Sequence, residues 1–465
     1  MSKKKILFFF SLIFLIVQPN THASIGDTYG FSSLNSALGL STVAGDPSSF
    51  SAYKNPATLS LMKDKKLLLG FGLVAAKPSF KEINNVVIEN EFTSDKLRTG
   101  SVNTSYRATF GQTLSALLQL SPSFYNLNIG IVAYLPFNSF AYMDTGETYI
   151  PEYILYRSST QKPEVHIGIG FNPFENIYLG LGLQVAFSVT SEAHVFLQTD
   201  ESKPSTMRFI ASQKLQANPY FGFLYNNNSW SIGGTVRLAS RSLNDMTLYS
   251  GARAFGDFAA LDFNFNAQST LYYDPFSIEM GTAYSWTTHS KSYLQLDFQQ
   301  WNNYQPPSLN IKNPETGQCE DESGTTGCSQ GVNITASINP DYDLKNIFIP
   351  RIGHEIKYPW ATLRVGYSYK PSIFKSLPTE SGNFLDPAKH SVSFGTGHTF
   401  KTLFGVQVPW QLNWHLSYHL LSSENITKSQ GDENGSGSED LKIGAPGYDT
   451  GGYVYSGGVT LSMAF

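Results

Sequence analysis

The sequence predicts an all-β fold: a 14-stranded antiparallel transmembrane β-barrel, plugged by a small, partly helical N-terminal hatch. Three observations support this prediction: an export signal at the N-terminus, many strands that alternate apolar and polar residues, and a low charged fraction of 15%. Soluble proteins usually carry about a quarter charged residues. Short strands rich in glycine and aromatic residues, in an exported chain, are typical of bacterial outer-membrane barrels.

Residues 1–23 have the pattern of a secretory signal peptide. Lysines at positions 3–5 precede an apolar run from Ile6 to Val17, and Thr21-His22-Ala23 offers a cleavage site of small residues. The alternative, a membrane anchor helix, is disfavoured because the run is short for a membrane span. Removing the three lysines takes the formal net charge from −4 to −7, so no basic patch indicates a nucleic-acid partner.

Residues 24–65 are predicted to form the hatch, and residues 66–465 the barrel. The first part of the hatch, up to Ser51, is small and polar with no sustained period, which indicates an irregular plug. Asn55 is a good helix N-cap and Pro56 suits the first helical position, so a short helix from Ala57 to Met62 is expected. We expect this helix to lie inside the barrel and block it.

The barrel strands are recognised by their period of two. Between Leu127 and Phe137, for example, apolar residues share one face while Asn128, Gly130 and Tyr134 share the other. The segment 256–288 is long for a single span. The fourteen predicted strands lie near residues 66–77, 103–120, 127–140, 161–171, 176–199, 205–225, 229–250, 256–288, 291–303, 345–357, 360–371, 388–400, 406–423 and 452–465.

A soluble β-sandwich would also alternate, but it buries its apolar faces against a second sheet. Here the other face carries charged and amide groups on strand after strand, and no predicted helices cover either face. A closed barrel with lipid outside and a polar lumen accounts for both facts. Most connections also alternate between short turns and longer polar loops, as expected for periplasmic and external connections.

Aromatic residues support the same orientation. Trp230, Trp286 and Trp360 each lie beside a short, periplasmic turn, which predicts an aromatic girdle, although aromatic core packing is an alternative. The last strand alternates and ends at Phe465, which resembles the assembly signal of outer-membrane barrels. Together with the export signal, this ending predicts localisation in the outer membrane.

Two features of the long polar loops bear on chemistry. Cys319 and Cys328 lie close together in one polar segment, and an exported chain meets an oxidising compartment, so a local disulfide is expected over free thiols or a metal pair. The acidic residues of the loop 424–451 do not follow the spacing of an EF-hand, so a flexible loop is favoured over a calcium site. We expect no metal and no cofactor.

Several blocks of residues carry a resemblance to a known family. Through them the chain resembles the outer-membrane long-chain fatty-acid transporter family, of the FadL and TodX type. The blocks are Gly39, Ala44 and Asp46 followed by Asn55-Pro56-Ala57, then Pro275 to Tyr284, Leu294 to Trp301, and Thr362 to Tyr369.

The resemblance implies a barrel closed from the periplasmic side by its hatch. It also implies that Asn55, Pro56 and Ala57 face the strand Leu127–Phe137 and act as a gate. In this family a kink in the third strand opens the wall sideways toward the lipid. Gly130 is a possible place for that strand to bend.

The function implied is import of hydrophobic small molecules, long-chain fatty acids or aromatic hydrocarbons, by passive diffusion without a cofactor. Phe31, at the start of the hatch, is a candidate for the inner binding site. Arg364 points into the lumen on the alternating pattern and could meet a ligand carboxylate. A structural ion pair is the alternative for Arg364, and Arg237 and Arg351 carry the same ambiguity.

Two rival functions remain. A general hydrophilic porin would keep its lumen open, which the hatch argues against. A barrel hydrolase would need a base such as His415 or His419 near Ser417, but no acid completes a triad. We therefore expect no enzyme activity, a monomer, and contacts with hydrophobic small molecules and outer-membrane lipid.

Overall fold

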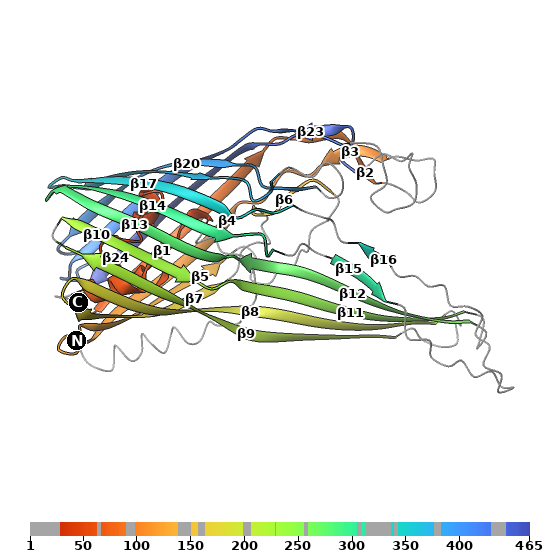
Figure 1. The fold of residues 1–465 in the computed structure, drawn as a ribbon, viewed down its shortest axis with the longest axis horizontal. Coiled ribbons are helices and arrows are strands. Elements are labelled where there is room, and N and C mark those ends of the chain that lie inside the picture. The colour runs from red at the N-terminus through yellow and green to blue at the C-terminus, as the bar shows by residue number, and fades with distance from the viewer. Residues whose placement is uncertain are drawn as a thin grey trace.

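The computed structural model shows a closed β-barrel with a plug inside it (Figure 1). It describes residues 28–62, 67–89, 98–137, 150–156, 163–198, 206–227, 229–254, 259–304, 308–312, 336–338, 343–375, 383–428 and 443–465. Within these residues the wall is formed by 14 strands and closes where the last strand pairs with the first. The predicted fold class is confirmed.

The wall strands agree closely with the predicted segments. Each predicted segment contains a wall strand, and two segments contain a pair of strands that follow one another. In chain order the strands are β1 (Leu67–Phe80), β4 (Thr109–Ser121), β5 (Leu127–Pro136), β7 (Glu164–Phe174), β8 (Ile177–Gln198), β9 (Thr206–Asn226), β10 (Trp230–Arg237) continued by β11 (Ser240–Ala254), β12 (Ala259–Asp274) continued by β13 (Phe276–Thr287), β14 (Ser290–Gln300), β17 (Ile347–Lys357), β18 (Thr362–Lys370), β20 (Lys389–Phe400), β21 (Trp410–Leu421) and β24 (Gly452–Ala464).

The long predicted span 256–288 is divided at Pro275. Proline has no backbone N–H to donate, so it is found at strand ends and bulges. Here it separates β12 from β13.

The two faces of the wall differ in the way the alternation predicts. Met280 is 62% exposed beside the buried Glu279, and Leu416 is 56% exposed beside the buried His415. The exposed side chains form an apolar outer surface, and the buried polar ones face the lumen. Trp230, Trp286 and Trp360 are exposed beside short turns, as a girdle requires and core packing does not.

Four strands run past the rest of the wall. At about 3.3 Å per residue, the 22 residues of β8 span about 70 Å, whereas 9–11 residues cross a membrane. Their outer halves form an extension in which β8 pairs with β11 in parallel, from Ser191 to Gln198 (Figure 1). The same end carries short paired strands: β2 (Ile83–Glu89) with β3 (Arg98–Val102), β6 (Glu152–Tyr153) with β19 (Phe384–Leu385), β15 (Ser308–Lys312) with β16 (Ala336–Ile338), and β22 (Asn425–Thr427) with β23 (Gly447–Asp449).

The hatch consists of turns and three short helices, α3 (Ser33–Ala37), α4 (Ser51–Lys54) and η1 (Pro56–Leu61). The last is the helix expected from Ala57 to Met62, but it is a 3₁₀-helix that begins at Pro56 and ends at Leu61. Its bonds run from residue i to i+3, as from the Met62 amide to the Leu59 carbonyl at 3.3 Å. Among the described residues, no helix is both long enough and apolar enough to cross a membrane.

Some predictions fall outside the residues that the structure describes. These are the signal peptide at residues 1–23, the proposed disulfide between Cys319 and Cys328, and residues 429–442 of the acidic loop.

Candidate functional site: the hatch and the lumen

A row of inward-facing glycines makes room for η1 against the wall. Gly130 of β5 pairs with Gly168 of β7, and on the next pair of strands Gly170 pairs with Gly180, which pairs with Gly222 of β9. A Cβ atom at Gly180 would stand 2.3 Å from the Ala57 amide nitrogen. The hatch therefore approaches the bare backbone of four neighbouring strands, which only glycine permits.

Asn55 fixes the start of η1 and joins it to the wall. Its Oδ1 accepts from the Ala57 amide at 3.0 Å, so it is the N-cap that the sequence predicts. Its Nδ2 donates to the Val43 carbonyl at 2.7 Å and to the Phe223 carbonyl at 3.1 Å. The side chain is completely buried, so one amide group holds together two parts of the hatch and β9.

Ion pairs tie the hatch to the opposite part of the lumen. Lys54 Nζ lies 2.5 Å from Glu279 Oε2, and Arg237 Nε lies 3.6 Å from Glu279 Oε1. Arg237 also donates to the Tyr53 carbonyl of the hatch. Thr235 Oγ1 donates to the Lys54 carbonyl at 3.0 Å. The residues around Lys54 are thus bonded through both side chain and backbone.

The network continues along β14 and β17. Gln295 Nε2 donates to Glu279 at 3.1 Å and to Asp297 at 2.5 Å, while its Oε1 accepts from the Val43 amide at 3.0 Å. Arg351 pairs with Asp297 at 2.5 Å and also donates to the Gly39 carbonyl. A buried ion pair is destabilising to break because it leaves an unpaired charge. The hatch is therefore firmly seated in this state.

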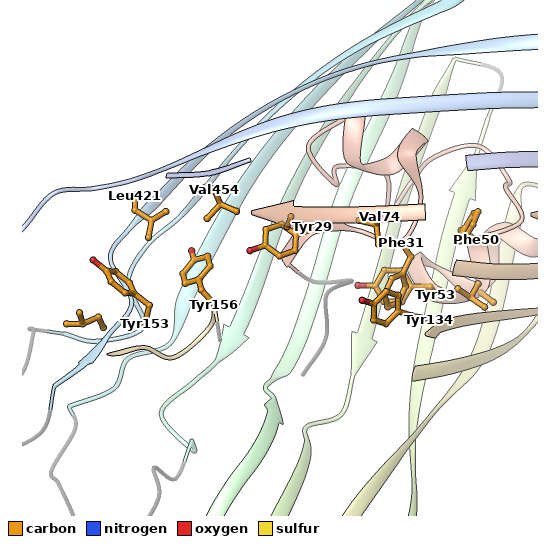
Figure 2. Close-up of a cluster of buried hydrophobic side chains, with 14 of the residues drawn as sticks. Tyr29, Phe31, Phe50, Tyr53, Val74, Tyr134, Tyr153, Tyr156, Leu421 and Val454 are labelled. Atoms are coloured by element: carbon orange, nitrogen blue, oxygen red, sulfur yellow. The ribbon is translucent and has the colours of Figure 1, made fainter. Parts of the chain in front are cut away.

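An aromatic cluster occupies the lumen above the hatch helices. The ring of Phe31 lies 4.5 Å from that of Tyr53 and is stacked on Tyr134 at 5.4 Å, between centroids. His166 approaches the Tyr53 ring edge-on at 4.9 Å. Figure 2 shows Phe31, Tyr53 and Tyr134 in contact, with Tyr29 and Tyr156 further along the lumen. All are buried, so the lumen combines an aromatic zone with the charged network.

A small polar cavity lies between these zones. Tyr53, His166 and Arg237 line it together with carboxylates. Gln184 spans part of it, donating to Glu164 and to Asp274 at 3.0 Å each.

Comparison with known proteins identifies the fold. No family model and no curated protein matches the sequence. Among solved structures, a Pseudomonas aeruginosa FadL homologue has a TM-score of 0.57 at 11% identity, covering 93% of this chain and 97% of that one. The Pseudomonas putida toluene transporter TodX has a TM-score of 0.55 at 14% identity, covering 94% of this chain and 99% of its own.

The fold is that of the FadL and TodX channels. The CymD monoaromatic hydrocarbon channel is also similar, with a TM-score of 0.51 at 11% identity and coverage of 94% and 97%. Identities this low establish the architecture, so the residues of this lumen must be interpreted individually.

Within this FadL-type barrel, the predicted position of Asn55-Pro56-Ala57 needs correction. These residues lie against Gly168, Gly180 and Gly222 of β7, β8 and β9, and not against the Leu127–Phe137 segment. The reason is steric, because Gly180 and Gly222 are paired and together offer a bare surface.

The hatch meets β5 one turn later. Leu59 and Ala52 lie over Gly130, and Asn128 Nδ2 donates to the Leu59 carbonyl at 2.8 Å. Gly130 itself is paired on both sides, with Leu117 and with Gly168. The strand pairing is therefore continuous at the position where a bend was expected.

Arg364 is engaged within the wall of this FadL-type barrel. Its Nε lies 3.1 Å from Glu355 Oε2, and its Nη1 donates to Asn413 Oδ1 at 2.9 Å. Tyr293 donates to the other oxygen of Glu355 at 3.0 Å. Of the two interpretations of Arg364, the structure displays the ion pair, as it does for Arg237 and Arg351.

The histidines considered for a hydrolase do not form a triad. His419 contacts Ser391 Oγ at 2.7 Å and Ser456 Oγ at 2.8 Å, and Ser417 contacts Ser393 Oγ at 2.7 Å. Within the described part of the chain no carboxylate bonds to either histidine, and the ring nitrogens of His415 have no hydrogen-bond partner. The same residues contain no group of three His, Cys, Asp or Glu side chains that could hold a metal ion.

Sequence reasoning missed two parts of the seat. One is the glycine row, although its signal was present as alternating glycines at inward positions of predicted strands. The other is the Lys54–Glu279 pair, which joins residues 225 positions apart and has no local signature.

Proposed function

We propose that this chain is an outer-membrane channel that imports hydrophobic small molecules, long-chain fatty acids or aromatic hydrocarbons, by passive diffusion. The observation that carries the proposal is the plugged lumen. Ordered hatch residues fill the interior, and an aromatic cluster around Phe31 lines the way past them. Aromatic side chains offer a hydrophobic molecule favourable contacts, whereas a sugar gains little from them.

The hatch is proposed to act as a gate toward the lipid. In the structure Leu59 and Ala52 cover Gly130, whose strand is paired on both sides. A lateral opening at Gly130 therefore requires two movements: the hatch must leave the glycine row, and β5 must separate locally from a neighbour. Asn55, Pro56 and Ala57 contribute by holding the hatch in its closed seat.

The two rival functions are less compatible with the lumen. A general porin needs a continuous aqueous path, and here the hatch is bonded across the interior from β9 to β17. A hydrolase needs a nucleophile, a base and an orienting group in contact. The His415, Ser417 and His419 positions do not supply that arrangement, and the similar structures are channels and transporters.

Whole-cell uptake tests the proposal. Cells that lack their own hydrophobic channels would express the chain and receive a labelled fatty acid, a labelled aromatic hydrocarbon or a labelled sugar. We expect faster uptake of the hydrophobic compounds than in cells with an empty vector, and no change for the sugar. Accelerated uptake of the sugar alone would overturn the proposal in favour of a porin.

A further inference from the structure

A lysine near the outer end of the lumen lacks a counter-ion. Lys389 is the first residue of β20, and it is 6% exposed. Its nearest recorded partner is the ring of Tyr156, with Nζ 5.9 Å from the centroid. Within the described residues its ammonium group makes neither an ion pair nor a hydrogen bond. By contrast, the inward cations Lys54, Arg351 and Arg364 are all paired with carboxylates.

The charges next to Lys389 leave one positive charge uncompensated. Lys370 of β18 stands directly opposite it in the strand pairing. Only Asp386 serves both: its Oδ2 lies 2.6 Å from Lys370 Nζ and also accepts from the Ile373 amide at 3.0 Å. Two like charges on directly paired residues are destabilising. A second anion beside Lys389 would balance the pair.

The surroundings of Lys389 are otherwise apolar. Leu421 stands opposite it on β21, and Tyr156, Val454 and Tyr29 belong to the same buried cluster (Figure 2). An anion that fits here therefore needs an apolar part as well as a charge. A carboxylate can accept a charge-assisted bond from the ammonium while its hydrocarbon tail contacts these side chains.

We propose that Lys389 anchors the carboxylate of an amphipathic ligand, with the tail among Tyr156, Leu421 and Val454. The inference rests on the proposed import function and specifies it. It makes Lys389 the residue that favours an anionic amphiphile over a neutral hydrocarbon. Arg364, the residue first considered for this role, is bonded to Glu355 and Asn413.

Tyr29 connects this site with the hatch. It belongs to the hatch segment, and its ring lies edge-on to that of His419 at 5.5 Å. His419 in turn contacts Ser391, two residues after Lys389 on the same inward face. A ligand tail in this cluster would compete with Tyr29 for space, so binding would be coupled to the position of the first hatch residues.

Equilibrium binding to the purified full chain in nanodiscs tests the proposal. The probes are laurate, 1-dodecanol with the same chain length, and acetate as the head group alone. We expect laurate to bind about 10- to 100-fold more tightly than dodecanol, the range for a hydrogen bond to a charged group, and acetate to bind weakly. Lys389→Met should remove the preference for laurate and leave dodecanol binding unchanged.

Two further variants separate charge from packing. Lys389→Arg should keep the preference, and Lys357→Met, which removes an exposed charge at the other end of the lumen, should behave as the unaltered chain. Heat-modifiable migration on gels checks that each variant has assembled. Equal binding of laurate and dodecanol by the unaltered chain, or full laurate preference in Lys389→Met, would overturn the inference while leaving hydrophobic import standing. Absence of binding by both would overturn the import proposal as well.

Discussion

Replacing Asn55 by alanine should loosen the hatch while the barrel remains assembled. The change removes three hydrogen bonds of 2.7, 3.1 and 3.0 Å, to Val43, Phe223 and Ala57. Each such bond contributes about 0.5–1.5 kcal/mol, so the expected loss of hatch stability is about 1.5–4.5 kcal/mol. All three backbone partners would be left unpaired in a buried place, which favours the upper part of this range.

Hydrogen exchange of the hatch amides, followed by mass spectrometry, measures this loss directly. Since each 1.4 kcal/mol is a factor of ten, amides of η1 should exchange about 10- to 1,000-fold faster in Asn55→Ala. Ser60→Ala is the matched control, because Ser60 Oγ bonds only to the Ala57 carbonyl of the same helix and its loss should have a smaller effect. Barrel amides should be unaffected in both. Unchanged exchange of η1 in Asn55→Ala would refute the role of Asn55 in seating the hatch.

Three other perturbations address the seat. In Gly222→Ala the new Cβ would stand 2.2 Å from Asn55 Oδ1, so the hatch should shift and single-channel conductance should rise; conductance equal to that of the unaltered chain would count against close packing. Lys54→Met and Glu279→Gln, combined in a double-mutant cycle of hatch exchange, should give a coupling of about 0.5–3 kcal/mol, whereas additive effects would mean that the pair does not act as a unit. The pKa of the Asp46 carboxyl should respond to its surroundings: burial raises it, but the Lys291 ammonium at 2.6 Å and other cations outweigh burial, and the net shift is downward. The Asp46–Lys291 pair should therefore support the hatch above about pH 4, the ordinary value for Asp, and lose that support as the pH falls further. Hatch exchange, corrected for its intrinsic pH dependence, should show this loss in the unaltered chain and not in Asp46→Asn.

The wall of the barrel was predictable because its rule is local. A period of two with one apolar face appears in each strand separately, as between Leu127 and Phe137, and short turns set the connections. The division at Pro275 was also implicit, since proline cannot donate to a neighbouring strand. The outer extension was not predictable in this way, because the parallel pairing of β8 with β11 depends on how four long strands twist together.

The candidate site was only partly predictable. The N-cap role of Asn55 and the first helical position of Pro56 follow from backbone chemistry, and both hold. The strand that this helix faces depends on which inward positions lack a side chain in adjacent strands, and that requires the register. The partners of Lys54 and Arg364 are likewise set by closure of the barrel, which brings distant strands together.

The central claim is that the hatch blocks the lumen and must move before a hydrophobic molecule can pass. A reversible lock tests it most directly: Ala52→Cys with Gly168→Cys, in a chain with Cys319 and Cys328 changed to serine. A Cβ at Gly168 stands 3.3 Å from that of Ala52, so a small adjustment reaches the 3.5–4.5 Å of a disulfide.

Uptake of labelled laurate into proteoliposomes would be measured before and after reduction, with Ala52→Cys alone as the control. We predict that the oxidised double variant takes up little laurate, that reduction restores uptake, and that the control is insensitive to reduction. Equal uptake by the oxidised and reduced double variant, with the disulfide verified by mass spectrometry, would contradict the claim.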